Sequence, residues 1–253
     1  MQSGSTGTER NPGLLWNRTG NKMKIYLIRH GMTAGNREKR YVGCHTDEDL
    51  CEEGIAQIQS NEYPRVDHLY VSPLKRCITT AELIYPHMPV ISNVKLQEMD
   101  FGDFEYKNYH ELNGNAAYQA WIDSGGRTAF PNGEGREQFS RRCVEGFWEC
   151  LADCKDTDRV AFVVHGGTIM AIMEQYGEPK GEYYKWQIAN GAYLSLEVMK
   201  SLSEEQLRWA FFVVAQSLIF CCTAIGGNPV SQKNHIFSNI FTQKWNTFIT
   251  VYQ

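Results

Sequence analysis

Runs of apolar residues alternate along the chain with segments whose apolar positions recur every three or four residues. The runs predict strands at 24–29, 67–71, 159–164 and 192–198. The helical pattern predicts helices at 51–60, 74–85, 108–122, 134–154 and 167–176. Strands that alternate with helices indicate an α/β fold, which we expect to be a three-layer sandwich: a mostly parallel central sheet with helices on both faces.

The two ends of the chain depart from this pattern. Residues 1–22 contain Gly, Ser, Thr and Asn but few apolar anchors, so we expect a disordered leader or an added extension. The folded domain is predicted to occupy residues 23–199. Residues 200–253 are predicted to be an atypical, apolar C-terminal extension.

Residues 209–225 of that extension are apolar on all sides and follow a segment, 203–206, that has the form of a helix capping box. One interpretation is packing on the domain or on a partner subunit, as in a homodimer. The second is membrane contact through this run, and the third is a poorly structured or foreign extension. The run is at the short limit for a bilayer span and contains Gln216 and Ser217, so packing is favoured over an anchor.

The composition is that of a soluble globular enzyme. The chain has 42% hydrophobic and 21% charged residues and a formal net charge of −4. This charge lacks the basic excess that nucleic-acid binding requires, so no nucleic-acid partner is expected. The eight cysteines include no Cys-x-x-Cys pair and no secretory signal precedes them, which favours reduced thiols and a cytoplasmic location.

Two histidines follow predicted strands. His30 stands in Arg29-His30-Gly31 after strand 24–29, and His165 begins His-Gly-Gly after strand 159–164. The carboxyl ends of parallel strands meet at one edge of a sheet, so both should face one crevice. Arg76, early on the helix after strand 67–71, should reach the same place.

These residue types together are suited to a phosphate monoester. Guanidinium groups such as Arg29 and Arg76 bind phosphate oxygens bidentately, which a lysine cannot do. A neutral imidazole is a competent nucleophile at pH 7. A carboxylic acid under apolar cover can stay protonated and serve the leaving group, and Glu98 is our candidate. Three other carboxylates of the same loop are alternatives, namely Asp100, Asp103 and Glu105.

Five motifs make the chain resemble the histidine phosphatase, or phosphoglycerate mutase-like, superfamily. They span roughly residues 23–198: Arg-His-Gly-x-Thr-x-x-Asn at 29–36, Ser-Pro-Leu-x-Arg at 72–76 with Thr-Ala-Glu at 80–82, Leu-x-Glu before Phe-Gly at 96–102, Pro-x-Gly-Glu at 131–134, and His-Gly-Gly at 165–167. The resemblance implies a metal-independent phosphatase in which His30 forms a phosphohistidine. No metal and no cofactor are then expected.

The resemblance also implies the remaining roles. His165 should donate a hydrogen bond to an equatorial oxygen of the phosphoryl group, with a backbone N–H of Gly166 beside it. Glu98 would protonate the leaving alkoxide and then activate the water. Asn36 and Thr33 are candidate substrate-binding residues, although Asn36 could instead only stabilise a loop.

The family contains both mutases and phosphatases. The segment between Glu98 and His165 is short, which favours hydrolysis. Residues 102–105, 118–121 and 130–134 most resemble the α-ribazole phosphatase branch, so a small phosphorylated metabolite, α-ribazole phosphate or a broader set, is the expected partner. Phosphoglycerate mutase is the alternative enzyme. A catalytically silent phosphate-binding protein anchored by its tail is the alternative from another class.

Several other positions need an interpretation. Cys44 beside His45 suggests a metal ligand pair, but the family pattern makes this segment a rim of the substrate site. Cys51 stands where the family usually has Thr, so the N-cap of the helix at 51–60 should be weak. Phe104, Tyr118 and Trp121 are expected more in the core than in stacking on a flat substrate ring.

Overall fold

A six-stranded sheet forms the centre of the structure, a computed structural model that describes residues 22–199 and 210–212. The strand order is β3-β2-β4-β1-β5-β6. In chain order the strands are β1 (Met23–Arg29), β2 (His68–Val71), β3 (Ile91–Ser92), β4 (Arg159–Val164), β5 (Tyr193–Met199) and β6 (Ala210–Phe212). The pairs β3·β2, β2·β4 and β4·β1 are parallel, whereas β5 and β6 join antiparallel. The predicted α/β fold with a mostly parallel sheet is confirmed.

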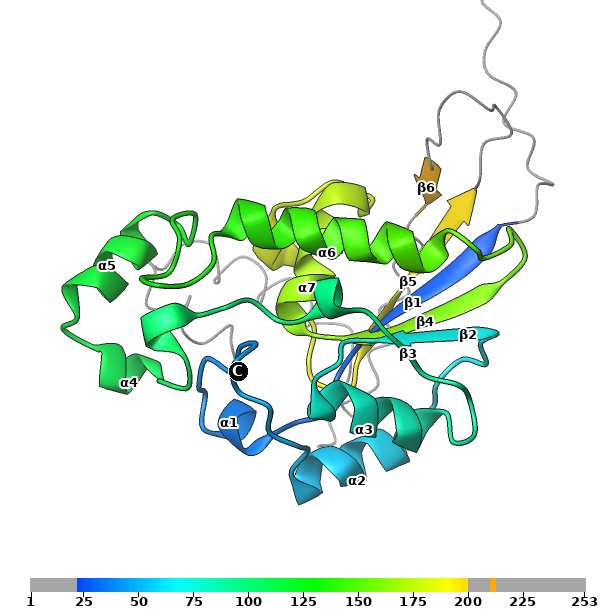
Figure 1. Cartoon of the computed structure of the whole chain (residues 1–253), viewed down its shortest axis with the longest axis horizontal. Helices are drawn as coiled ribbons and strands as arrows, with labels where there is room; N and C mark the ends of the chain where they lie inside the picture. The colour runs from blue at the N-terminus through cyan, green and yellow to red at the C-terminus, as the bar shows by residue number, and fades with distance from the viewer. Residues whose placement is uncertain (1–21, 200–209, 213–253) are drawn as a thin grey trace, which may run out of the picture.

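Helices cover both faces of the sheet (Figure 1). They are α1 (Ala34–Arg37), α2 (Glu52–Ser60), α3 (Lys75–Ile84), α4 (Tyr109–Leu112), α5 (Ala116–Asp123), α6 (Arg136–Leu151) and α7 (Gly166–Tyr176), with short 3-10 turns at Val94–Leu96, Gly102–Phe104 and Tyr183–Trp186. Helices α6 and α7 lie on one face and α2 and α3 on the other, while α4 and α5 extend past the carboxyl edge of the sheet. This edge is where the predicted site residues follow their strands.

Alternation along β1 and β4 builds two cores. Ile25 and Leu27 point into the larger cluster, which includes residues of α6 and α7. Ile28 points into the smaller cluster, which α3 completes with Cys77 and Ala81. Successive side chains of a strand face opposite sides, so an apolar run without polar positions requires cover on both faces.

The predicted helix at 108–122 is wrong, because two short helices occupy this range. Gly114 has φ +81°, a left-handed conformation that ends α4 and that residues with a side chain rarely adopt. Asn115 then caps α5, since its side chain accepts a hydrogen bond from the N–H of Tyr118 at 3.0 Å. The apolar periodicity continues across the break, which is why the pattern alone predicts one helix.

The N-terminal ends of α2 and α6 can be compared with the sequence predictions. The weak cap expected for α2 is confirmed, because Cys51 makes no side-chain cap and its thiol donates instead to the carbonyl of Met32 at 3.3 Å. Helix α6 begins at Arg136 rather than 134, since the turn around Gly133 precedes it. Helix α1 and strand β3 are too short for the sequence pattern to predict.

The chain ends lie largely outside the described residues. Of the expected leader, only Lys22 is described, and its Nζ lies 2.9 Å from a carboxylate oxygen of Glu197. Of the run 209–225, only Ala210–Phe212 are described, and they form strand β6, which pairs with β5. In the described part of the chain, no helix is both long and apolar enough to span a bilayer.

Candidate active site

His30 follows the carboxyl end of β1, and only 3% of its surface is exposed. Its backbone N–H donates to the carbonyl of Val164 at 3.0 Å, so the pairing of β1 with β4 sets its position. Nδ1 lies 2.7 Å from the carbonyl of Gly31, and a carbonyl only accepts, so Nδ1 carries the proton and Nε2 keeps its lone pair. The pKa of His30 lies well below 6.5, mainly because the ring is buried and also because Arg76 and Arg29 are positively charged. The imidazole is neutral at pH 7 and nucleophilic at Nε2.

His165 follows β4 and is fully buried, with its ring centroid 5.2 Å from that of His30. Its Nδ1 accepts a hydrogen bond from Nε of Arg76 at 3.3 Å. The proton of the neutral ring is therefore on Nε2, which lies 2.7 Å from the hydroxyl oxygen of Ser72. Burial is the main cause that holds the pKa of His165 well below 6.5, and Arg76 adds to it.

Two arginines bring positive charge to these imidazoles. Arg76 is fully buried at the start of α3, and its terminal nitrogens donate to the carbonyls of Thr46 at 2.6 Å and Gly43 at 3.0 Å. Arg29, the last residue of β1, donates to the carbonyl of Ile188 at 2.7 Å. The two guanidinium groups thus place positive charge beside both imidazoles, where an anion would bind.

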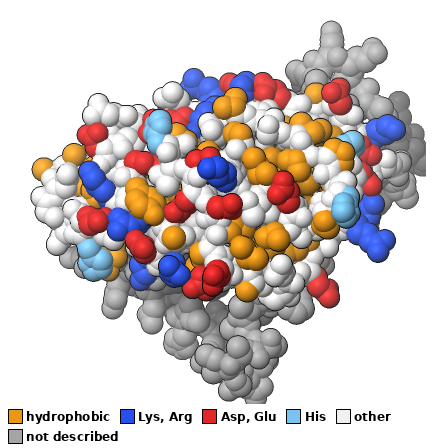
Figure 2. Space-filling model, turned by 60° about the horizontal axis from the view of Figure 1, so that its bottom comes forward, with side chains coloured by type: hydrophobic (Ala, Val, Ile, Leu, Met, Phe, Trp, Pro, Cys, Tyr) orange, Lys and Arg blue, Asp and Glu red, His pale blue; other side chains and the backbone are white. Residues whose placement is uncertain are grey.

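Elsewhere the charge is mixed. Figure 2 shows one face of the molecule on which acidic and basic side chains are interspersed with apolar ones. By contrast, the residues Arg29 and Arg76 are 7% and 0% exposed. The positive charge of the site is therefore local and sheltered from water, where it acts more strongly on a bound phosphate than at the surface.

Glu98 is the buried carboxyl group of the site. Its two carboxylate oxygens accept hydrogen bonds from the N–H of Met99 at 2.9 Å and from that of Gly167 at 3.1 Å. Gly167 lies two residues after His165, so this contact joins the acid to the second histidine. Burial outweighs both hydrogen bonds and the charges of Arg76 and Arg29, and it raises the pKa of Glu98. A raised pKa is what a proton donor near neutral pH requires.

The other three carboxylates of this loop point to different partners. Asp100 pairs with His45, Asp103 accepts a hydrogen bond from Asn132, and Glu105 accepts one from Thr46. Among the four candidates, the contact with the start of α7 belongs to Glu98.

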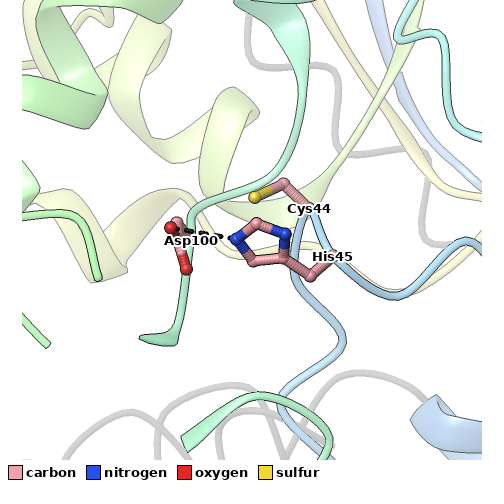
Figure 3. Close-up of side chains that lie close together, drawn as sticks. All are labelled: Cys44, His45 and Asp100. Atoms are coloured by element: carbon pink, nitrogen blue, oxygen red, sulfur yellow. Dashed lines mark ion pairs between the residues drawn. The ribbon is translucent and has the colours of Figure 1, made fainter. Parts of the chain in front are cut away.

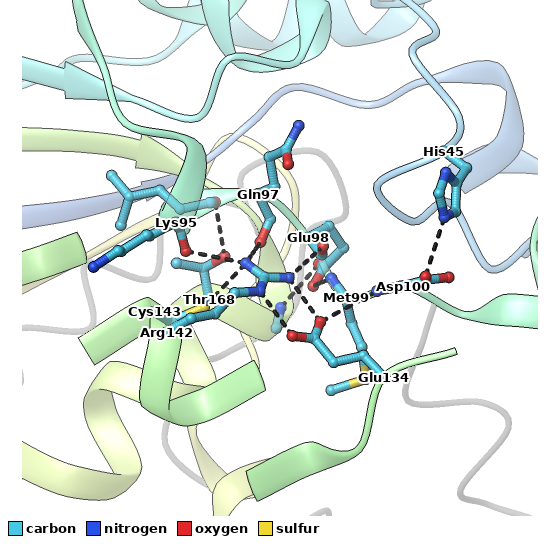
Figure 4. A network of polar contacts seen from close by, with 12 residues as sticks. His45, Lys95, Gln97, Glu98, Met99, Asp100, Glu134, Arg142, Cys143 and Thr168 are labelled. Atoms are coloured by element: carbon cyan, nitrogen blue, oxygen red, sulfur yellow. Dashed lines mark hydrogen bonds and ion pairs between the residues drawn. The ribbon is translucent and has the colours of Figure 1, made fainter. Parts of the chain in front are cut away.

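A partly buried ion pair fixes the backbone that carries Glu98 (Figure 4). Nε and Nη2 of Arg142 donate to the two carboxylate oxygens of Glu134 at 2.8 and 2.7 Å. The same guanidinium donates to the carbonyls of Lys95, Gln97 and Glu98 at 3.0, 2.8 and 3.0 Å. One side chain of α6 thus holds three carbonyls of the segment 95–98, and Glu134 of the Pro-x-Gly-Glu motif orients that side chain.

Thr33 and Asn36 cap each other. The Thr33 hydroxyl accepts from the backbone N–H of Asn36 at 3.2 Å, and the Asn36 side chain accepts from the backbone N–H of Thr33 at 3.3 Å. Nδ2 of Asn190 donates to the same Asn36 oxygen and to the carbonyl of His30, both at 3.1 Å. The structure places Thr33, fully buried, as a cap of α1, while Asn36 is half-buried beside the His30 loop.

Helix α7 begins with two glycines, Gly166 and Gly167, whose surroundings differ. A Cβ on Gly167 would collide with Oε1 of Glu98 and lie 3.0 Å from the ring of Phe139. A Cβ on Gly166 would lie 3.4 Å from Nε of Arg29, an ordinary contact. Gly166 is the first residue of the helix, where backbone N–H groups lack an intrahelical acceptor and favour an anion.

The aromatic side chains near the expected pocket rim are core residues. Phe104, Tyr118 and Trp121 are 1%, 4% and 3% exposed and belong to the larger cluster. Phe104 and Tyr118 meet edge to face, with ring centroids 5.5 Å apart. The expectation that they lie in the core is confirmed.

Sequence reasoning assigned no role to four residues that hold the site together. Ser72 and Thr80 stand inside the quoted motifs. The Thr80 hydroxyl accepts a hydrogen bond from the backbone N–H of Gly31 at 2.9 Å, and the Ser72 hydroxyl contacts Nε2 of His165. Asn190 precedes Gly191 just before β5, a turn signal that could have drawn attention to it. Arg142 sits in mid-helix without any local signal.

Comparison with known proteins agrees with this geometry. The model of the histidine phosphatase superfamily, branch 1, matches residues 25–208. The adenosylcobalamin/α-ribazole phosphatase of Escherichia coli is 30% identical over 70% of this chain and 90% of its own. The crystal structure of the α-ribazole phosphatase from Shigella flexneri matches with a TM-score of 0.64 and 26% identity, over 81% of this chain and all of that one.

A solved structure named as a mutase is also similar to this chain. The crystal structure of a phosphoglycerate mutase from Thermus thermophilus matches with a TM-score of 0.54 and 27% identity, over 68% of this chain and 92% of that one. The family model covers well over half of the chain. The protein is thus a phosphatase-type enzyme that belongs to branch 1 of the histidine phosphatase superfamily.

Proposed function

We propose that this protein is a phosphomonoesterase that works through a phosphohistidine at His30, without a metal ion. The observation that carries the proposal is the tautomer of His30. Its Nδ1 is bound to the Gly31 carbonyl, so the lone pair of Nε2 is free beside the charges of Arg29 and Arg76. A neutral, oriented imidazole between two buried cations is suited to attack a phosphate dianion.

In the first step Nε2 of His30 forms a bond to phosphorus as the bond to the ester oxygen breaks. Arg29 and Arg76 bind the equatorial oxygens, whose charge spreads in the transition state. Glu98, whose pKa is raised by burial, gives its proton to the leaving alkoxide. In the second step the Glu98 carboxylate takes a proton from water, which attacks the phosphohistidine and releases phosphate.

His165 serves this scheme in two ways. Its Nδ1 orients Arg76 by accepting from Nε. Its single N–H, on Nε2, is donated to Ser72. We propose that a phosphoryl oxygen replaces the Ser72 hydroxyl as the acceptor of this N–H when substrate binds. Gly166 at the start of α7 and Asn36 beside the His30 loop are the further substrate contacts we propose.

We propose α-ribazole phosphate as the preferred substrate within this reaction. The support is the similarity to the E. coli and S. flexneri α-ribazole phosphatases, which extends over nearly the full length of both relatives. A broader set of small phosphorylated metabolites comes next, because Tyr106 stands where that branch usually has Gly and Gly135 where it often has Ser, both where the rim of the site is expected. The physiological compartment that we propose is the cytoplasm.

The test is phosphate release from a generic aryl phosphate in the presence of EDTA, with His30→Ala measured beside the wild type. We expect activity that survives chelation and disappears in His30→Ala. The matched control is His110→Ala, which removes an exposed imidazole from α4. Labelling with a radioactive ester should leave phosphate on the wild type in an acid-labile, base-stable bond. Folded wild type that is inactive on aryl phosphates and α-ribazole phosphate would favour the silent phosphate-binding alternative.

A mutase activity is the second candidate, supported by the similarity to the T. thermophilus phosphoglycerate mutase. A mutase returns the phosphoryl group of His30 to a second hydroxyl before water can take it. We expect phosphate release from phosphoglycerate to exceed its transfer between positions. Transfer that is faster than release would establish the mutase instead.

A further inference from the structure

Cys44, His45 and Asp100 bring three different ligand atoms together outside the catalytic residues (Figure 3). One imidazole nitrogen, the thiol sulfur and one carboxylate oxygen all lie within 4.8 Å of one another. Nε2 of His45 is 3.1 Å from Oδ2 of Asp100. The backbone N–H of Cys44 donates to the carbonyl of Met99 at 3.2 Å, which holds the two loops in contact.

This donor set matches one class of metal ion. A combination of thiolate, imidazole and carboxylate is typical of Zn²⁺, which binds such atoms at about 2.0–2.3 Å in a tetrahedron. Ligand atoms in such a tetrahedron are about 3.5 Å apart, so the three side chains need to move by an ångström or so. His45 is largely exposed, with 65% of its side chain accessible, and is free to make this adjustment.

The surroundings of Cys44 favour a cation. The carboxylates of Asp100, Glu105 and Glu134 act electrostatically on Cys44, against the opposing charge of Arg142. Cys44 and Asp100 also line a cavity of about 330 Å³, which leaves room for a water as fourth ligand. A cation here would neutralise part of this concentration of negative charge.

A second grouping of one His, one Cys and one Asp serves as a comparison, because its cysteine is part of the core. His68, Cys154 and Asp158 are equally close, and Nε2 of His68 lies 3.0 Å from Asp158. There, however, the Cys154 sulfur donates to the carbonyl of Cys150 and contacts the Tyr70 hydroxyl in the core. Among the described residues, the Cys44 thiol has no such partner, so it is available to a ligand.

We propose that Cys44, His45 and Asp100 form a binding site for one Zn²⁺ ion, separate from the phosphate site. On binding, the Cys44 sulfur loses its proton to the solvent and forms the bond to zinc, while His45 binds as the neutral imidazole. The ion would tie together two loops that both serve catalysis. Gly43 and Thr46, on either side of the cysteine and histidine, hold Arg76 through their carbonyls, and Asp100 lies two residues after Glu98.

The experiment titrates Zn²⁺ alone into the full chain against a chromophoric chelator. The parent protein carries Cys221→Ser and Cys222→Ser, so that adjacent thiols of the tail do not compete. We expect one equivalent to bind, with an affinity that falls at least tenfold in Cys44→Ser, His45→Ala and Asp100→Asn. His68→Ala, which removes the imidazole of the second grouping, should bind zinc as the parent does.

Co²⁺ supplies a readout that reports the ligands directly. The parent should show a thiolate-to-cobalt charge-transfer band that is absent in Cys44→Ser, and the melting temperature of the parent should rise with zinc. Zinc binding that is equal in the parent and in Cys44→Ser would overturn the proposal, as would cobalt binding without the charge-transfer band. Circular dichroism of each variant verifies that lost binding is not lost folding.

Discussion

Nε of Arg76 donates a hydrogen bond to Nδ1 of His165 at 3.3 Å. This contact joins α3 to the end of β4, two elements that are far apart in the chain. It also fixes both groups, because it leaves the Arg76 terminal nitrogens aimed at carbonyls of the 43–46 loop and places the only proton of His165 on Nε2. The binding cation and the second histidine are therefore one unit.

Replacement of Arg76 by lysine tests this unit. An ammonium group cannot bind His165, two carbonyls and a phosphate at the same time, although it keeps the charge. We expect kcat/KM of Arg76→Lys for an aryl phosphate to fall by about 100-fold or more, the range for loss of one electrostatic stabiliser. Arg37→Lys is the control, since Arg37 is exposed and paired with Glu53. Equal activity of the two variants would contradict the role of Arg76.

Removal of the Ser72 hydroxyl leaves the Nε2–H of His165 without its acceptor. A buried donor without a partner costs about 1–3 kcal/mol. We expect Ser72→Ala to lower the free energy of unfolding by that amount and kcat by about tenfold, with KM less affected. Urea unfolding and steady-state kinetics measure the two effects. Ser60→Ala, at an exposed helix end, should change neither.

The role of Glu98 depends on the leaving group. An alkoxide needs the proton of the acid, whereas nitrophenolate leaves without it, so Glu98→Gln should impair alkyl phosphates more. We expect a loss of more than about 100-fold in the first step for an alkyl phosphate. With nitrophenyl phosphate, we expect a burst of nitrophenol followed by slow turnover, because no base activates the water. An equal loss on both esters in the first step would assign the proton to another group.

Substitution of Gly167 should displace the same acid. The Cβ of Gly167→Ala would collide with Oε1 of Glu98 and crowd Phe139, so we expect a lower melting temperature and slower turnover of alkyl phosphates. Gly166→Ala is the matched variant one residue earlier, where the new methyl only touches Arg29. A similar loss in both variants would contradict a specific role for the contact with Glu98, because helix propensity alone favours alanine at both positions.

Stability should fall as the pH drops below about 6.5. The folded pKa values of His30 and His165 lie well below the ordinary value, so the unfolded chain binds more protons in this range. Each histidine then contributes up to about 1.4 kcal/mol per pH unit to the fall in unfolding free energy. Urea unfolding between pH 7.5 and 5.5 measures the slope, which we expect to be smaller in His30→Gln. An unchanged slope in that variant would refute the assignment.

Much of the candidate site could be predicted because it follows strand ends. The apolar runs of β1, β2 and β4 are legible in the sequence, and parallel strands bring their carboxyl ends to one edge, so His30, His165 and Arg76 had to be neighbours. The break between α4 and α5 could not be predicted in this way. Its cause is one left-handed glycine and one asparagine cap, which the apolar periodicity does not register.

The sequence by itself determined the layers of the fold and the residues that carry the chemistry, because apolar periodicity and motif spacing are local properties of the chain. Only the tertiary structure decided the tautomers of His30 and His165, the raised pKa of Glu98 and the meeting of Cys44 with Asp100. These depend on burial and on partners such as Ser72, Gly167 and Met99 that are distant in sequence. Hydrogen-bond direction and desolvation are properties of a packed environment, and no local pattern encodes them.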